Sequence, residues 1–208
     1  MPYGFLDIAV TPSVKAAQAQ NGSAHLWENF KGHRTFDRLT ESEEAFIGQR
    51  DSFYMATVSE TGWPYVQHRG GPRGFLRVID DRTLAFADFA GNRQYISLGN
   101  LAAEGRVSLI LMDYANRRRL KIFAHAEVKS LADNPDLAEK LSTPGYRGKA
   151  ERAFVLHLDA FDWNCPQHIT QRFDAPDVAQ AIGALQQRIE ALEAENKRLR
   201  EQGSAQPD

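Results

Sequence analysis

The central part of the chain alternates apolar and polar residues in short runs that turn-forming residues separate. This alternation is typical of β-strands with one buried face. It predicts strands at SFYMATVSE (52–60), WPYVQHRGG (63–71), GFLRVID (74–80), TLAFADF (83–89), VSLILMDY (107–114), LKIFAHAEVKSL (120–131) and FVLHLDAFDWN (154–164). Few helices come between them, so we expect a mainly β fold, a six- or seven-stranded antiparallel barrel.

Helical patterns border these strands. Thr40 and Glu43 have the spacing of a reciprocal capping box, which predicts a short helix from about 41 to 50. GNRQYISLGNLAAEG (91–105) has the spacing of a second short helix, with Asn92 in its first turn. Upstream, the stretch from residue 13 to 30 is a possible helix that the glycine at 22 interrupts, and residues 133 to 152 look helical and loop-like.

The C-terminal segment has a different period. Its apolar residues recur in alternating steps of four and three, the pattern of coiled-coil positions a and d. These positions are Val178, Ile182, Leu185, Ile189, Leu192, Asn196 and Leu199. Isoleucine at a, leucine at d and one asparagine at a favour a parallel two-stranded coil, so we expect a homodimer. The alternative is one amphipathic helix packed on the barrel.

These patterns divide the chain into four parts. They are an N-terminal peripheral segment (1–39), the barrel domain (40–175), a C-terminal parallel coiled-coil helix (177–202) and a disordered tail (203–208).

Composition narrows the class of protein. The 208 residues are 42% hydrophobic and carry a net charge of -2, which suits one globular domain and gives no reason to expect nucleic acid or an acidic membrane as main partner. A single cysteine, Cys165, excludes an intrachain disulfide framework. We see neither a signal peptide nor a membrane span of about 20 apolar residues, and expect a cytoplasmic protein.

No metal-binding or nucleotide-binding motif stands out. The six histidines are scattered without HxxxH or CxxC spacing, and neither GxGxxG nor a P-loop occurs. Cys165 lacks a recognisable histidine and acid partner, so we do not interpret it as a nucleophile.

Two stretches suggest an anion site. In HRGGPRGF, Gly70 and Gly71 lie in a predicted strand beside Arg69, where glycine indicates either a β-bulge or the close approach of a ligand to the backbone. In FADFAGNRQYIS, Arg93 follows a strand and a glycine at the start of a predicted helix. Free amides at a helix start together with an arginine fork can bind phosphate, although such a turn is usually an ordinary surface turn.

The order TGWPYVQHRGG, LAFADFAGNRQYISLGNL, RVSLILMDY, RRRLKIFAHAEV resembles the flavin-binding split barrel of pyridoxamine 5'-phosphate oxidase and its relatives, over residues 40 to 170. The ending FDWNCPQHITQR is similar to a subgroup of related flavoproteins. The resemblance implies a homodimer with FMN at the subunit interface, acting as an oxidoreductase on a small molecule, with NADH or NADPH as a candidate electron donor.

In that family, the strand after the first hairpin lies against the flavin, and a Ser-Arg-Lys triplet at the next strand-to-helix turn holds the FMN phosphate. Asn92, Arg93 and Gln94 occupy the triplet here, so only its arginine is retained. Arg69 or Arg118 could replace the missing lysine charge.

The candidate site residues follow from these patterns and from the resemblance. The catalytic candidates are His68 and His168, and the substrate candidates are Tyr146 and Arg152. The cofactor-binding candidates are His68, Arg69, Gly70, Gly71, Asn92, Arg93, Gln94, Arg118, Arg119, Trp163, Asn164 and Gln167. No metal ligand is among them.

Other functions stay open. Oxidation of pyridoxamine phosphate itself is not expected, because the basic set that binds its phosphate is not recognisable. The alternatives are a non-catalytic flavin-binding or storage module, or the same barrel with haem or the deazaflavin F420.

Overall fold

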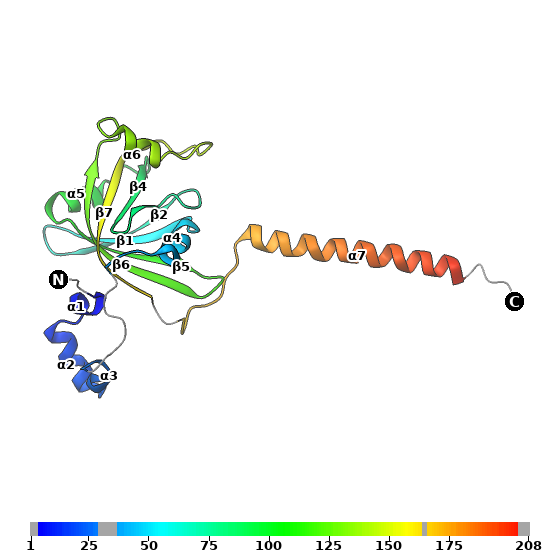
Figure 1. Cartoon of the computed structure of the whole chain (residues 1–208), viewed down its shortest axis with the longest axis horizontal. Coiled ribbons are helices and arrows are strands. Elements are labelled where there is room, and N and C mark those ends of the chain that lie inside the picture. Colours follow the sequence, from blue (N-terminus) through cyan, green and yellow to red (C-terminus); the bar gives the residue numbers. More distant parts are fainter. Residues whose placement is uncertain (1–3, 29–36, 164–165, 204–208) are drawn as a thin grey trace. The chain divides into compact units, whose positions relative to one another are not determined.

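The computed structural model describes residues 4–28, 37–163 and 166–203 (Figure 1). The chain divides into two compact units. One comprises Met1–Asp113 with Arg117–His168, and the other comprises Tyr114–Asn116 with Ile169–Asp208.

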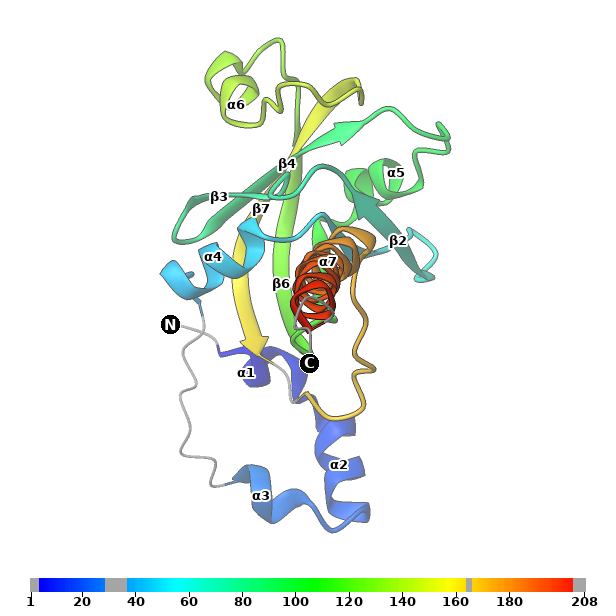
Figure 2. The ribbon, with the colours of Figure 1, turned by 90° about the vertical axis from the view of Figure 1, so that its right-hand side faces the viewer.

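A seven-stranded antiparallel sheet forms the centre of the first unit (Figures 1 and 2). Its order is β2-β1-β5-β6-β7-β4-β3. The strands are β1 (Ser52–Val58), β2 (Pro64–Gly70), β3 (Arg77–Asp80), β4 (Thr83–Phe89), β5 (Arg106–Asp113), β6 (Arg118–Lys129) and β7 (Ala150–Trp163). Within the described residues the edge strands β2 and β3 do not pair, so the sheet is not closed. This confirms the predicted split-barrel class.

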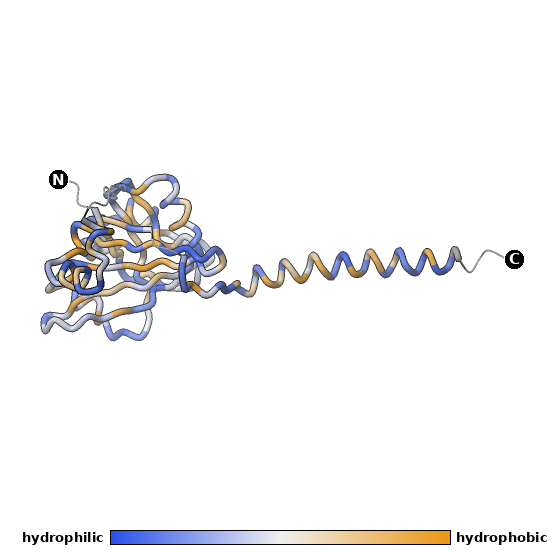
Figure 3. The backbone as a smooth tube through the Cα atoms, turned by 90° about the horizontal axis from the view of Figure 1, so that it is seen from below, coloured by the Kyte–Doolittle hydropathy of each residue, from blue (hydrophilic) through white to orange (hydrophobic). Residues whose placement is uncertain are grey.

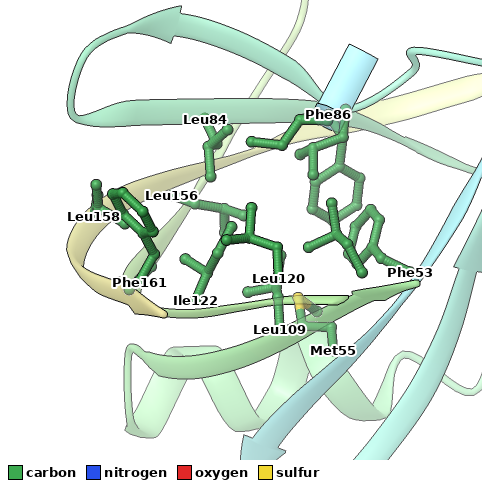
Figure 4. Close-up of a cluster of buried hydrophobic side chains, with 14 of the residues drawn as sticks. Phe53, Met55, Leu84, Phe86, Leu109, Leu120, Ile122, Leu156, Leu158 and Phe161 are labelled. Atoms are coloured by element: carbon green, nitrogen blue, oxygen red, sulfur yellow. The ribbon is translucent and has the colours of Figure 1, made fainter. Parts of the chain in front are cut away.

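The core lies inside the curved sheet (Figure 4). Alternate residues point inward, as the burial of β5 illustrates with Val107, Leu109 and Leu111. Phe86 of β4 stacks on Phe154 of β7, with ring centroids 5.0 Å apart. In β5 the inward positions are therefore those that the alternation of the sequence predicts, whereas β4 is buried at five consecutive positions.

The helices confirm most of the predicted helical segments. Their bounds are α1 (Phe5–Ala9), α2 (Pro12–Gln20), α3 (Ala24–Glu28), α4 (Glu41–Gly48), α5 (Ile96–Ala103), α6 (Pro135–Lys140) and α7 (Ala175–Gly203). The capping box of Thr40 and Glu43 is formed at the start of α4. Gly22, with φ of 69°, separates α2 from α3. Among the described helices, none combines the length and apolar character that a membrane crossing requires.

Several element boundaries differ from the sequence prediction; β3, for example, begins at Arg77 and not at residue 74, and α7 begins at Ala175 and not at residue 177. Helix α5 begins at Ile96, so Asn92 lies in the preceding loop and not in the first helical turn. The last strand begins at Ala150, four residues before the predicted start, because its first residues pair with Phe89 and Asp88 of β4. Of the predicted disordered tail, residues 204–208 lie outside the described part of the chain.

Candidate functional site

A cavity of about 160 Å³ lies where β2 and β4 end, beside the loop that leads into α5. Arg69 and Gln67 enter it from β2, since alternate residues of a strand share one face. Asp88 and Phe89 come from β4, and the remaining lining residues are Gly91, Asn92, Arg93, Tyr95, Ser97, Leu98, Glu151 and Phe154. Three predicted cofactor-binding residues, Arg69, Asn92 and Arg93, therefore share one cavity.

A buried carboxylate links two arginines at this cavity. Asp88 Oδ1 accepts a hydrogen bond from Arg69 Nη1 at 2.7 Å, and Asp88 Oδ2 accepts one from Arg152 Nη1 at 3.0 Å. Arg152 Nη2 also donates to Glu151 Oε2 at 2.9 Å. Counting Arg93, the cavity and its border hold three arginines and the two carboxylates of Asp88 and Glu151. The net charge of this set is therefore +1.

Burial disfavours the charged form of both partners in the ion pair between Arg69 and Asp88. Burial raises the pKa of the Asp88 carboxyl, against the two neighbouring arginines, which lower it. Burial likewise lowers the pKa of the Arg69 guanidinium, and Asp88 acts against that change. A guanidinium still keeps its proton at neutral pH, because its ordinary pKa is above about 12. The cation is therefore permanent and needs nearby anions.

The bonds to Asp88 do not satisfy Arg69 completely. Its side chain lies over the rings of Phe86 and Phe154, at 5.9 and 5.2 Å from their centroids. Its Nε–H is buried and finds no acceptor among the described residues. Buried donors normally have a partner, so the site has unused hydrogen-bonding capacity.

The loop before α5 adds an exposed cation with an unusual backbone. Arg93 has φ of 59° and Tyr95 has φ of 53°, a left-handed conformation that costs a non-glycine residue about 1 kcal/mol. The amide N–H of Gln94 donates to Asn92 Oδ1 at 3.1 Å, which tightens the turn. Within the described part of the chain, Arg93 makes no hydrogen bond or ion pair. Strained residues of this kind are common at ligand sites.

Two side-chain hydrogen bonds fix α5 against the first hairpin. Ser97 Oγ donates to Gln67 Oε1 at 3.1 Å, and Asn100 Nδ2 donates to Thr57 Oγ1 at 2.9 Å. Asn100 is buried, so the second bond would be costly to lose. The start of α5 is therefore held at the cavity.

The glycines at 70 and 71 have different surroundings. A Cβ on Gly71 would lie 2.6 Å from Cγ of Phe75, so the absence of a side chain there is needed for core packing. The Gly71 N–H donates to the carbonyl oxygen of Asp51 at 2.9 Å. At Gly70 a Cβ would lie 3.0 Å from the His68 ring and 3.8 Å from the carbonyl oxygen of Asp51, and the ring is a flexible neighbour. Phe75 therefore gives a packing reason for glycine at 71, and the contact of Gly70 and Gly71 with a ligand stays a prediction.

Several predicted residues lie away from the cavity. His68 is exposed on the opposite face of β2 from Arg69, with its ring against Tyr54. Gln167 and His168 are exposed beyond the end of β7, in a turn where His168 has φ of 64°.

Arg118 and Trp163 form a second group, because β6 begins where β7 ends, while Arg119 points to the opposite face of β6. The guanidinium of Arg118 lies 4.6 Å from the Trp163 ring centroid, and Trp163 Nε1 donates to Glu43 at 2.6 Å. Glu151, at the cavity, is at the other end of β7. Within one chain, this group and the cavity therefore lie at opposite ends of β7. The predicted Asn164 lies outside the described residues, as does Cys165.

The two predicted substrate residues are near the cavity. Arg152 is engaged with Asp88 and Glu151, as described above. Tyr146 contacts Phe89 with ring centroids 4.8 Å apart. Phe89 and Tyr146 also line a neighbouring cavity of about 280 Å³ between α6 and the outer face of β4 and β7, with Ala87, Leu131, Ala138, Leu141, Ser142, Thr143, Gly148 and Ala150.

The sequence analysis missed Asp88, Glu151, Gln67 and Ser97. Asp88 follows four buried strand residues in TLAFADF, and a carboxylate in that position was a usable signal of a buried ion pair. The other three carry no distinctive motif. Within the described residues, no cluster of three or more metal-ligating side chains occurs.

Comparison with known proteins identifies the family. A family profile described as pyridoxamine 5'-phosphate oxidase matches residues 39–157. The chain belongs to the pyridoxamine 5'-phosphate oxidase family. That match spans β1 to β6, α4, α5 and the first half of β7, and so includes the whole cavity.

Solved structures of low sequence identity also match. An F420 reductase is 20% identical, with 60% of this chain and 98% of that chain covered and a TM-score of 0.43. A protein of Clostridium acetobutylicum related to general stress protein 26 is 13% identical, with 66% and 94% covered and a TM-score of 0.44. An FMN-binding protein of Syntrophomonas wolfei is 15% identical, with 74% and 95% covered and a TM-score of 0.42. No curated protein matches the chain.

Proposed function

We propose that this member of the pyridoxamine 5'-phosphate oxidase family is an FMN-dependent oxidoreductase that acts on a small molecule. The observation that carries the proposal is the convergence of Arg69 and Arg93 on one cavity, at the turn where the family resemblance locates the FMN phosphate. Arg93 supplies the direct phosphate contact, because it is exposed and its guanidinium is not engaged by any described residue.

The charges around the cavity fit a phosphate group. A phosphate monoester carries a charge of about -1.5 to -2 at neutral pH. The excess positive charge of the arginines favours such an anion, although Asp88 and Glu151 reduce the attraction. The buried Nε–H of Arg69 is a further hydrogen-bond donor without an acceptor among the described residues.

Strand β2 offers contacts for the rest of the flavin. It is an edge strand, so half of its backbone N–H and C=O groups point away from β1. Such groups can recognise the donor and acceptor edge of the ring system, and Gly70 leaves the backbone uncovered. When bound, FMN would supply the electron-transfer chemistry, while the chain binds and orients it and limits access of water.

A second protomer would complete the site. The cavity is smaller than the roughly 300 to 1,000 Å³ typical of complete ligand sites. Tyr54, Val58 and Val66 are exposed on the outer face of β1 and β2, an apolar surface suited to a barrel dimer. His68 is on that same face, so a role for it would require the dimer.

The substrate side is proposed to be the cavity beneath α6. Phe89 borders both cavities, and Tyr146 with the hydroxyls of Ser142 and Thr143 gives the second one a polar rim. Arg152 is better placed to stabilise Asp88 than to bind an anionic substrate, because both of its terminal nitrogens are already hydrogen-bonded.

Anaerobic reduction tests the enzymatic role. The FMN-loaded protein is mixed with NADH or NADPH and its flavin absorption is followed, before and after readmission of oxygen. An oxidoreductase is expected to bleach and then recover its spectrum. A flavin that no nicotinamide or small-molecule donor reduces would instead support the alternative of a flavin-binding or storage module.

A further inference from the structure

Helix α7 presents an apolar stripe to solvent. It runs for 29 residues, and its apolar residues recur along the tube in Figure 3. The exposed fractions of the stripe are 44% at Val178, 48% at Ile182, 65% at Leu185, 54% at Ile189, 40% at Leu192 and 53% at Leu199. A regular row of large exposed apolar side chains indicates an interaction surface.

The spacing of the stripe defines its partner. Ile182 and Ile189 take position a, Leu185 and Leu192 take position d, and Asn196 is the single polar a residue. The stripe is only two residues wide per heptad, as in a two-stranded coil, whereas a helix packed on a globular core needs about three. We propose that α7 pairs with α7 of a second copy of this chain as a parallel, in-register, two-stranded coiled coil.

Charges beside the stripe are complementary in that arrangement. In a parallel pair, position g of one helix meets position e of the following heptad in the other helix. Arg188 at g would meet Glu193 at e, and Glu195 at g would meet Arg200 at e. Both contacts are attractive, and the two-fold symmetry of a homodimer makes each of them twice.

Asn196 distinguishes parallel from antiparallel pairing. In the parallel coil it faces Asn196 of the other copy, and the two amides can hydrogen-bond to each other. In an antiparallel coil, a positions face d positions, so Asn196 would face an apolar residue such as Leu185 in the register that pairs Ile182 with Leu199. A buried amide without a partner is costly, so the parallel coil is favoured.

The coil is independent of the proposed flavin site. Its residues belong to the second compact unit, and none of them lines either cavity of the first. Three heptads are marginal as an isolated coil, so association of the barrels would raise the effective concentration of the helices. The consequence for function is a self-specific dimerisation element that excludes partners with a different a, d, e and g pattern.

Cross-linking of the full chain tests this pairing. Cys165 is replaced by Ser, and a single cysteine is introduced as Leu199→Cys at position d. The parallel coil brings the two introduced thiols together, so mild oxidation should convert most of the chain to a covalent dimer. The matched control is Arg198→Cys, one residue away at position c, which should stay mostly monomeric under denaturing electrophoresis. Failure of Leu199→Cys to cross-link better than Arg198→Cys would overturn the proposal.

Two further variants separate the coil from unspecific proximity. In the Leu199→Cys background, Ile182→Asp with Ile189→Asp should abolish cross-linking, because two charges enter the seam. Ala184→Asp with Ala191→Asp makes the same chemical change at position c and should leave cross-linking intact. Equal effects of the two pairs would refute the assigned seam. FMN titration of all variants should be unchanged, which keeps this test separate from the proposed function.

Discussion

Replacing Arg93 by alanine should show whether this residue binds the phosphate of FMN or the rest of the flavin. Riboflavin lacks the phosphate of FMN, so a residue that binds only the phosphate contributes to FMN affinity and not to riboflavin affinity. Alanine also keeps the backbone cost of the left-handed conformation at this position, since both residues carry a Cβ. The substitution therefore removes the guanidinium and little else.

The size of the effect follows from the surroundings of Arg93. Within the described residues it has no hydrogen bond or ion pair that FMN binding would have to break. A hydrogen bond to a charged group contributes about 1.5 to 3 kcal/mol. Arg93→Ala should consequently weaken FMN binding by about tenfold to a hundredfold. The effect should shrink at high salt, because Arg93 is exposed and its charge is screened.

Quenching of flavin fluorescence measures both affinities on the same proteins. The control is Arg198→Ala, an exposed arginine of α7 that should change neither. An unchanged FMN affinity of Arg93→Ala would remove Arg93 from the phosphate site. An equal loss of FMN and riboflavin affinity would show that the substitution disturbs the whole cavity.

Three further substitutions test the local physical arguments. Arg93→Gly should raise the free energy of unfolding by about 1 kcal/mol, because glycine adopts the left-handed conformation without cost. The same variant should bind FMN more weakly, because it lacks the guanidinium. Urea denaturation that shows no gain in stability would contradict the proposed backbone strain. Gly71→Val should destabilise the fold by about 1 to 3 kcal/mol through its clash with Phe75, whereas Gly99→Ala, where nothing lies within 4 Å, should not. Glu43→Gln should make the free energy of unfolding depend less on pH in the acid range. Burial raises the pKa of Glu43, but its hydrogen bonds together lower the pKa by more than burial raises it. The pKa of Glu43 in the folded protein therefore lies below the ordinary value of 4.5. The unfolded chain then binds more protons, and stability falls as pH drops from 4.5 through the folded pKa. Denaturation at pH 7 and pH 4 checks this, and an unchanged pH dependence in the variant would refute it.

The strands β1 and β5 could be predicted because burial alternates along them, whereas β4 is a continuous buried run. TLAFADF was placed at the bounds that β4 has, and the capping residues of α4 fixed the start of that helix. The start of α5 was misplaced, because local spacing does not reveal that Arg93 and Tyr95 adopt left-handed conformations. The sequence also gave no indication that β2 and β3 stay unpaired, since strand order depends on contacts distant in the chain.

The site could be predicted only where it follows local chemistry. Arg69 and Arg93 carry the anion signal in their own neighbourhoods, and they do line one cavity. The bridge from Asp88 to Arg152 was missed, because it joins two strands 64 positions apart in sequence. The packing of Phe75 beside Gly71 was not foreseen for a related reason, because it depends on the folded position of the Phe75 ring. Trp163 and Arg118 pack together at the far end of β7, which no local pattern could show.

The central claim is that the barrel binds FMN, and the visible absorption spectrum of the purified protein, before and after incubation with FMN and removal of the excess, tests it most directly. The account predicts the bands of oxidised flavin, with one FMN retained per chain and less retained by Arg93→Ala. An intense Soret band, the spectrum of F420, or no retained chromophore after incubation with FMN would contradict it.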